Sequence, residues 1–166
     1  MRANIQLIRI DNRLVHGQVG ITWTNSLDID TIVVVDNEVA SNIVPKKLMS
    51  NIAKAANVRI SFYSIDDFLE AYHNNNSHQK LFVVVRNIST VYELCRKGLE
   101  AQNINIGNIH YERGRVPLNK KVYLNREDIE AINYLLDNGY NIFFQDVPGT
   151  IVEKINHLDF DKLKMR

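Results

Sequence analysis

Short apolar runs alternate with helix-like stretches along this chain. Residues 31–35 form a continuous β-branched run, which is typical of a strand buried on both faces. The pattern predicts strands at residues 5–10, 31–35, 58–63, 81–85, 104–109, 121–124 and 141–145. It predicts helices at residues 17–26, 45–56, 65–73, 89–99 and 126–138. This alternation is typical of βαβ units, so we expect an α/β fold with an open, mainly parallel central sheet and helices on both faces.

The composition is typical of a single-domain globular protein. The 166 residues contain no linker, repeat or low-complexity tract, so we expect a single domain over residues 1–166. The 20 basic and 19 acidic residues nearly balance, which leaves no strong positive field for nucleic acid. Cys95 is the only cysteine, so no intrachain disulfide can form. The start has no secretory signal pattern and no apolar run reaches about 18 residues, so we expect a cytoplasmic protein.

The segment after the first predicted strand concentrates reactive side chains. Arg9, Asp11, Arg13 and His16 follow closely on one another, at the strand end where parallel α/β sheets place their sites. Imidazole is nucleophilic near neutral pH, and a phosphoryl group carried on nitrogen is readily passed on. Arginine offers a charged planar fork that matches phosphate oxygens. A helix predicted to start near Gly17 adds backbone amides that favour an anion.

These residues also have plainer interpretations. A single histidine near a strand end is commonly a surface or helix-capping residue. Arg9 and Arg13 could be solvated, or one of them could pair with Asp11. From the residues alone, phosphoryl transfer through His16 is therefore one hypothesis beside these structural roles.

The order of motifs adds a family resemblance. Residues 9–19, reading RIDNRLVHGQV, resemble the signature of IIB components of the mannose, fructose and sorbose family of the bacterial phosphoenolpyruvate-dependent sugar phosphotransferase system. The resemblance continues through residues 36–40, 104–111 and 124–139, and so covers almost the whole chain. Asn12 stands where relatives often have an acid, and Val15 where they often have isoleucine. Neither departure touches the residues to which the family assigns chemistry.

The resemblance implies a role for each residue of the signature. His16 matches the phosphorylated histidine, with the phosphoryl group expected on Nδ1. Arg9 and Arg13 match arginines that line the phosphate site, with Gly17 allowing close approach of the backbone. Asp11 matches a positioning acid of the same loop. No cofactor is implied, and magnesium is dispensable if the arginines neutralise the phosphate.

The resemblance also implies partners. The chain would take a phosphoryl group from a IIA protein and donate it to a sugar held by a IIC/IID membrane permease, as a protein-phosphohistidine–sugar phosphotransferase. That role places it in the cytoplasm, at the inner face of the membrane, and a homo-oligomer is compatible with it. Residues 107–111 and 144–148 are most similar to members for N-acetylgalactosamine and related amino sugars. The alternatives are a regulatory protein that has lost transfer and a protein that binds a free anion in the same loop.

Other residues near the strand ends are weaker candidates for this site. His110 follows the fifth predicted strand and could reach the same sheet edge, although a loop-positioning role is the simpler interpretation. Arg86 and Asn87 end the fourth predicted strand and could add a donor or simply end the strand. Asp36 is not expected to be a receiver-type phosphoacceptor, since basic residues replace the acids such a site needs. The histidines are too scattered to predict a metal site, and no glycine-rich nucleotide motif occurs.

Overall fold

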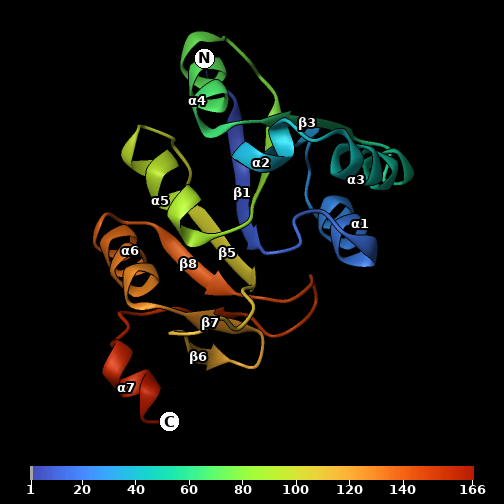
Figure 1. Cartoon of the computed structure of the whole chain (residues 1–166). Helices are drawn as coiled ribbons and strands as arrows, with labels where there is room; N and C mark the ends of the chain where they lie inside the picture. Colours follow the sequence, from blue (N-terminus) through green and yellow to red (C-terminus); the bar gives the residue numbers. More distant parts are fainter. Residues whose placement is uncertain (1) are drawn as a thin grey trace.

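A computed structural model describes residues 2–166 as one α/β unit built on a seven-stranded sheet (Figure 1). The strand order is β3-β2-β4-β1-β5-β8-β9. All neighbours pair in parallel except β8 and β9. These strands are β1 (Asn4–Asp11), β2 (Thr31–Val35), β3 (Arg59–Tyr63), β4 (Lys80–Val85), β5 (Asn103–Asn108), β8 (Asn141–Phe144) and β9 (Glu153–Lys154). The expected α/β class and mainly parallel sheet are confirmed.

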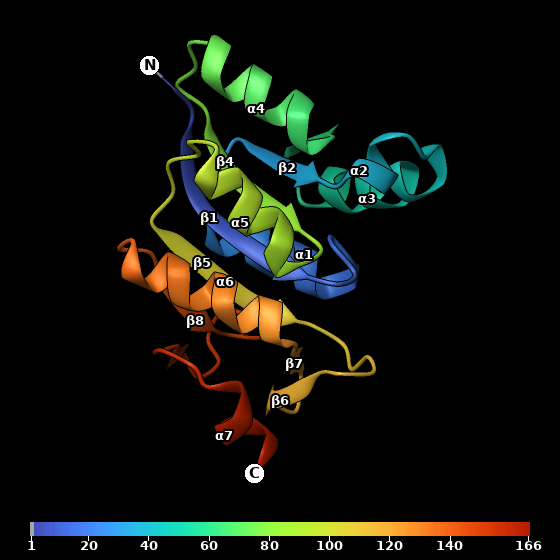
Figure 2. The same cartoon turned by 60° about the vertical axis from the view of Figure 1, so that its left-hand side comes forward.

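Helices cover both faces of the sheet, as expected. They are α1 (Gly17–Ser26), α2 (Asn37–Ala40), α3 (Ile43–Ala55), α4 (Ile65–Asn74), α5 (Ile88–Arg96), α6 (Arg126–Asp137) and α7 (Phe160–Lys164). One core contains side chains of α4, α5, α6 and α7, and the other contains side chains of α1, α2 and α3. Figure 2 shows α4, α5 and α6 in a row along the first of these faces. None of the helices between residues 2 and 166 has the length and apolar character needed to span a bilayer.

Alternation along the strands divides the side chains between the two cores. In β2, Val33 and Val35 enter the core under α4, α5 and α6, whereas Ile32 and Val34 enter the core under α1 and α3. In β4, Phe82 and Val84 also enter the α1 and α3 core. Both faces of these strands are therefore buried, which explains why the strands read as continuous apolar runs instead of alternating ones.

Several local expectations needed correction. Helix α3 begins two residues before the predicted position, because the Asn42 side chain caps it by accepting from the Val44 amide. Helix α5 ends at Arg96, and Gly98 follows with φ of +96°. The predicted strand at 121–124 is β7 (Val122–Leu124), which leaves the main sheet and pairs antiparallel with β6 (Val116–Asn119). The short α2, α7, β6 and β9 were not predicted.

The topology of the sheet predicts a ligand site at the carboxyl end of β1. The crossover from β1 leads through α1 toward β2, whereas the crossover from β4 leads through α5, on the opposite face, to β5. The direction of the connections therefore reverses around β1, which lies between β4 and β5. Ligand sites of open α/β sheets lie beyond the carboxyl ends of the strands at such a reversal.

Candidate functional site

The loop from β1 to α1 folds into a tight turn over this edge. The Leu14 amide donates to the Asp11 carbonyl, and Leu14 takes the left-handed conformation with φ of +58°. Leu14 and Val15 are buried in the core under α1 and α3, which anchors the loop from below. Gly17 follows with φ of +47°, a conformation that favours glycine. The loop thus holds His16 at the start of α1.

Helix α1 differs from every other helix in residues 2–166 at its amino terminus. Helices α2 to α7 each have an N-cap side chain that accepts a hydrogen bond from a backbone amide of the first turn. His16 is the N-cap of α1, and its side chain makes no such bond. The first amides of a helix have no partner within the helix. Those of α1 are therefore available to an anion beside the imidazole.

The Asp11 carboxylate contacts four residues of the site. Its carboxylate is fully buried, and Oδ2 accepts from Nη2 of Arg9 at 3.1 Å and from Nδ2 of Asn108 at 3.2 Å. The same oxygen lies 3.1 Å from Nε2 of His16, and Oδ1 accepts from the Arg13 amide at 3.0 Å. Burial raises the pKa of Asp11, but the bonds from His16 and Arg13 and the charge of Arg9 outweigh burial and hold the pKa below its ordinary value. Asp11 is therefore an ionised acceptor at neutral pH.

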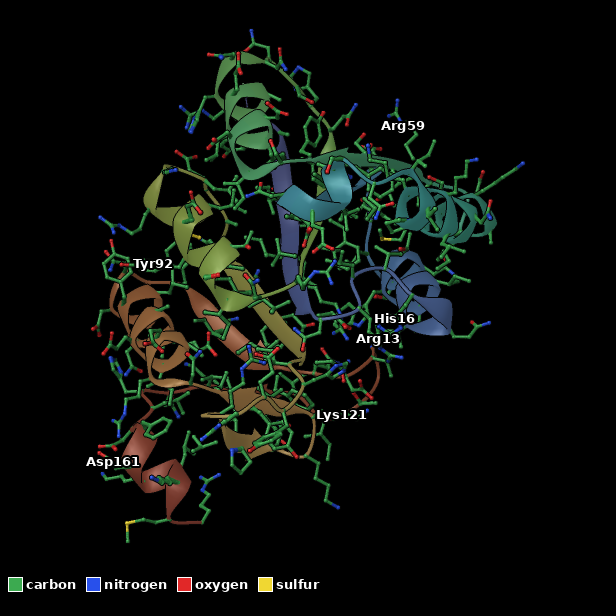
Figure 3. All side chains as sticks on the ribbon, in the orientation of Figure 1. Arg13, His16, Arg59, Tyr92, Lys121 and Asp161 are labelled. Atoms are coloured by element: carbon green, nitrogen blue, oxygen red, sulfur yellow. The ribbon has the colours of Figure 1, made fainter. Side chains whose placement is uncertain are left out.

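This contact determines which nitrogen of His16 is available. An ionised carboxylate only accepts hydrogen bonds, so Nε2 must carry the proton that it shares with Asp11. In the neutral form of the ring, Nδ1 then keeps its lone pair. The His16 side chain is 18% exposed, so the ring is held by the protein but reachable from solvent. Figure 3 shows His16 and Arg13 together beside α1.

The two arginines of the loop lie in different environments. Arg13 is exposed, and its guanidinium makes no hydrogen bond or ion pair with any residue from 2 to 166. Arg9 is only 2% exposed and lies beneath the loop, on the face covered by α1. The family resemblance predicts that both line a phosphate site, and that role stays a prediction. The structure places the Arg13 guanidinium in solvent and the Arg9 guanidinium in an ion pair with Asp11.

A shell of polar and aromatic groups surrounds the buried Arg9 guanidinium. Nη1 donates to Oδ1 of Asn105 at 2.5 Å and to the Gln145 carbonyl at 3.1 Å. The ring centroid of Trp23 lies 5.2 Å from the guanidinium carbon. Gly107 supplies the space, because a Cβ there would overlap the guanidinium. Burial lowers the pKa of Arg9, while Asp11 opposes this, and the guanidinium stays charged at any physiological pH.

The other candidate residues lie at the same edge of the sheet but do not contact the Asp11 carboxylate. Nε of Arg86 donates to Oδ2 of Asp36 at 2.9 Å, and Asn87 caps α5 by accepting from the Thr90 amide. His110 is exposed, and its backbone amide donates to Oδ1 of Asn12. Asn12 also donates from Nδ2 to the Arg86 carbonyl at 2.8 Å, so it ties the ends of β4 and β5 to the loop. These contacts are structural, and none involves the His16 ring.

The sequence prediction missed three contributors to the site. Asn105 and Asn108 lie in β5 and the Gln145 carbonyl lies just after β8, far along the chain from the loop. A signal for two of them is visible in retrospect. Asn105 and Asn108 interrupt an otherwise apolar buried strand, and a buried polar side chain needs a partner. Within residues 2–166 no cluster of His, Cys, Asp and Glu could hold a metal ion.

Comparison with known proteins gives a consistent result. The profile of the family described as PTS system sorbose subfamily IIB component matches residues 5–165. The N-acetylgalactosamine-specific phosphotransferase enzyme IIB component 1 of Escherichia coli is 39% identical over 92% of this chain and 96% of its own length. The mannose-specific EIIAB component of Escherichia coli is 30% identical over 83% of this chain and 43% of its own.

Solved structures agree. The crystal structure of the Escherichia coli N-acetylgalactosamine-specific IIB component 1 has a TM-score of 0.87 at 38% identity, covering 92% of this chain and 100% of that one. The IIB domain of the sorbose permease from Klebsiella pneumoniae has a TM-score of 0.86 at 27% identity, with 96% of each chain covered. Profile, relatives and structures point to one family over nearly the full length. The chain therefore belongs to the sorbose-type IIB components of the bacterial sugar phosphotransferase system.

Proposed function

We propose that this IIB component accepts a phosphoryl group on Nδ1 of His16 from a IIA protein and passes it to a sugar held by a IIC/IID permease. IIB components are phosphotransferases that work with such partners. The observation that carries the proposal is the contact between Nε2 of His16 and the buried Asp11 carboxylate. It leaves Nδ1 as the free nucleophile beside the uncapped start of α1.

The transfer follows from this geometry. The Nδ1 lone pair attacks phosphorus on the donor's phosphohistidine, the new N–P bond forms, and the donor's N–P bond breaks. The His16 ring gains positive charge while its Nε2–H still donates to Asp11, so the fixed carboxylate stabilises the charge as it develops. In the second transfer a sugar hydroxyl oxygen attacks phosphorus and the new O–P bond forms as the Nδ1–P bond of His16 breaks. The hydroxyl proton passes to a base outside this chain, and the electron pair of the broken bond returns to Nδ1, so that His16 is again the neutral Nε2–H tautomer.

The phosphate oxygens need positive partners at this edge. The Arg13 guanidinium makes no ion pair with residues 2–166, so it can turn toward a phosphoryl group on His16 without first breaking one. The backbone amides at the start of α1 add donors, and Gly17 presents no side chain that would block them. Phosphoryl transfer depends mainly on positioning and electrostatics, which these groups supply.

The direct test is transfer from a phosphorylated IIA protein of the mannose class. We expect the intact mass to rise by one phosphoryl group, on a bond that is labile in acid and stable in base, as a phosphoramidate is. Nitrogen-15 spectra of labelled histidine should place the phosphorus on Nδ1. A protein that takes up no phosphoryl group from such a donor, yet binds phosphate saturably, would instead be the anion-binding alternative.

Replacing Arg13 by Gln should slow phosphoryl acceptance with little change in folding, because the side chain is exposed. Groups that stabilise a developing charge are commonly worth about 2.7–4 kcal/mol, roughly a hundredfold to a thousandfold in rate. Arg13→Lys should recover only part of the rate, since lysine keeps the charge and lacks the planar fork. Rapid-quench measurements of the single-turnover rate would check both. Wild-type rates in Arg13→Gln would remove Arg13 from the site.

The sugar is inferred from relatives. Those at 39% and 33% identity are both named as N-acetylgalactosamine-specific, and we infer that this chain serves N-acetylgalactosamine or a related amino sugar. A strain lacking the chain should lose growth on that sugar and keep growth on mannose. Unchanged growth on N-acetylgalactosamine would contradict the assignment. Working with a IIC/IID permease would place the chain in the cytoplasm at the inner face of the membrane, and that role is compatible with a homo-oligomer.

A further inference from the structure

Oδ2 of Asp11 receives a donor that the transfer mechanism does not use. Nδ2 of Asn108 lies 3.2 Å from it, on the same oxygen that meets Nε2 of His16. Asn108 is buried at the last position of β5, and the register shift between Ile10 and Asp11 places Asp11 opposite it. Only the amide nitrogen can face an ionised carboxylate, so this contact has one favourable orientation.

We infer that Asn108 is a positioning residue for phosphoryl transfer, which holds the Asp11 carboxylate so that His16 keeps its proton on Nε2 and presents Nδ1. The inference rests on the proposed function, because it assigns a cause to the tautomer that transfer needs. Asn108 does not touch the imidazole and acts through Asp11 alone.

Each contact of the carboxylate constrains a different motion. The Arg13 amide holds Oδ1, and Arg9 approaches Oδ2 from the α1 face of the sheet. Asn108 approaches Oδ2 from the neighbouring strand. Loss of the Asn108 donor leaves Arg9 as the one fixed donor on Oδ2 beside His16, so the carboxylate can tilt toward the α1 face. Functional groups have to be held within about 10–20° of their productive geometry, and a larger tilt disturbs the contact with His16. The imidazole could then place its proton on Nδ1, where it blocks the nucleophile.

The backbone keeps the two strand ends together independently of this side chain. The Asn12 backbone amide donates to the Asn108 carbonyl at 2.9 Å, and the Asn12 side-chain oxygen Oδ1 accepts from the His110 amide. Neither bond involves the Asn108 side chain. Substitutions at position 108 should therefore change the carboxylate more than the loop.

The test compares Asn108→Ala with Asn108→Asp. Loss of the donor in Asn108→Ala should lower kcat for acceptance by about 10- to 100-fold, by analogy with the loss of groups that orient metal-binding histidines. KM for the phosphorylated IIA protein should stay unchanged, because Asn108 is buried. Asn108→Asp keeps the shape but sets a second carboxylate against Oδ2, so at pH 7 it should be slower than Asn108→Ala.

The relative kcat values of the two variants distinguish a positioning role of Asn108 from a packing role. If Asn108 only fills space, the isosteric aspartate should be the milder change and alanine the worse one. A milder Asn108→Asp, or wild-type kcat in Asn108→Ala, would overturn the inference. Should Asn108→Ala fold poorly, the kcat and spectra of Asn108→Asp decide alone, and wild-type values in that variant would refute it.

A second readout does not require transfer at all. Nitrogen-15 shifts of His16 in the resting protein should report the Nε2–H tautomer in the wild type and a mixed or protonated ring in the variants. Asn133→Ala is the matched control, since Asn133 makes two hydrogen bonds with Leu158 away from the site and its loss should leave the His16 spectrum unchanged. If the wild type accepts no phosphoryl group but the tautomer still depends on Asn108, the proposed function fails and the positioning role stands.

Discussion

His16→Ala should abolish phosphoryl acceptance, with no residual label above background. The substitution removes the imidazole nucleophile, and neither Asp11 nor Arg13 can replace it. Asp11 is buried beneath the loop, and Arg13 is a permanently charged cation. The measurement is incubation with phosphorylated IIA protein, followed by intact mass and peptide mapping. Folding should survive, because the side chain of His16 does not cap α1.

His110→Ala is the matched control. His110 is also a histidine at the carboxyl edge of the sheet, but its side chain is exposed and only its backbone amide contacts the loop, at Asn12. Its loss should leave acceptance close to wild type. Label that persists in His16→Ala, or that maps to His110, would show that the transfer mechanism proposed here is wrong.

The fold was largely predictable because the buried strands consist of continuous apolar residues. Both faces of β2 and β4 are covered, so each strand appears as an unbroken apolar run bounded by polar residues. Polar caps such as Asn125, which forms a capping box with Asp128, delimit the helices. The β6–β7 hairpin was missed because Val116–Asn119 is short and contains a proline, a pattern that does not predict a strand. The two-residue β9 gives no periodic signal.

The site was predictable only where it is local in sequence. The loop residues Asp11, Arg13 and His16 sit together in the chain and in the fold. The burial of Arg9 is not local. Alternation along β1 points its side chain to the α1 face, where register with β5 sets it opposite Asn105. Arg9 is covered by Trp23 of α1, and its partner Asn105 lies 96 positions away in the sequence, so no pattern within the loop reveals the burial.

The buried charge pair implies a large stability effect. Arg9→Met should lower the free energy of unfolding by about 3–5 kcal/mol, since removing one partner of a buried pair leaves the other charge uncompensated. Chemical denaturation at pH 7 would measure it. The double variant Arg9→Met with Asp11→Leu should recover much of the loss, because it leaves no unpaired charge. Lys97→Met, which breaks an exposed pair with Glu93, should leave stability nearly unchanged. A small penalty in Arg9→Met alone would mean that the guanidinium is dispensable to the fold.

The same pair predicts how that penalty depends on pH. The pKa of Asp11 is lowered in the folded protein, so its ionised form adds stability above the ordinary aspartate value of about 3.9, and this is lost as the pH falls through the folded value. In Arg9→Met the burial of Asp11 is less well opposed, so the pKa of Asp11 rises and the carboxyl protonates at higher pH. A protonated Asp11 needs no counter-charge, so the stability difference between wild type and variant should shrink on acidification from pH 7 toward pH 4. A difference that stays constant over that range would show that packing around Trp23 and Gly107, and not charge, accounts for the destabilisation.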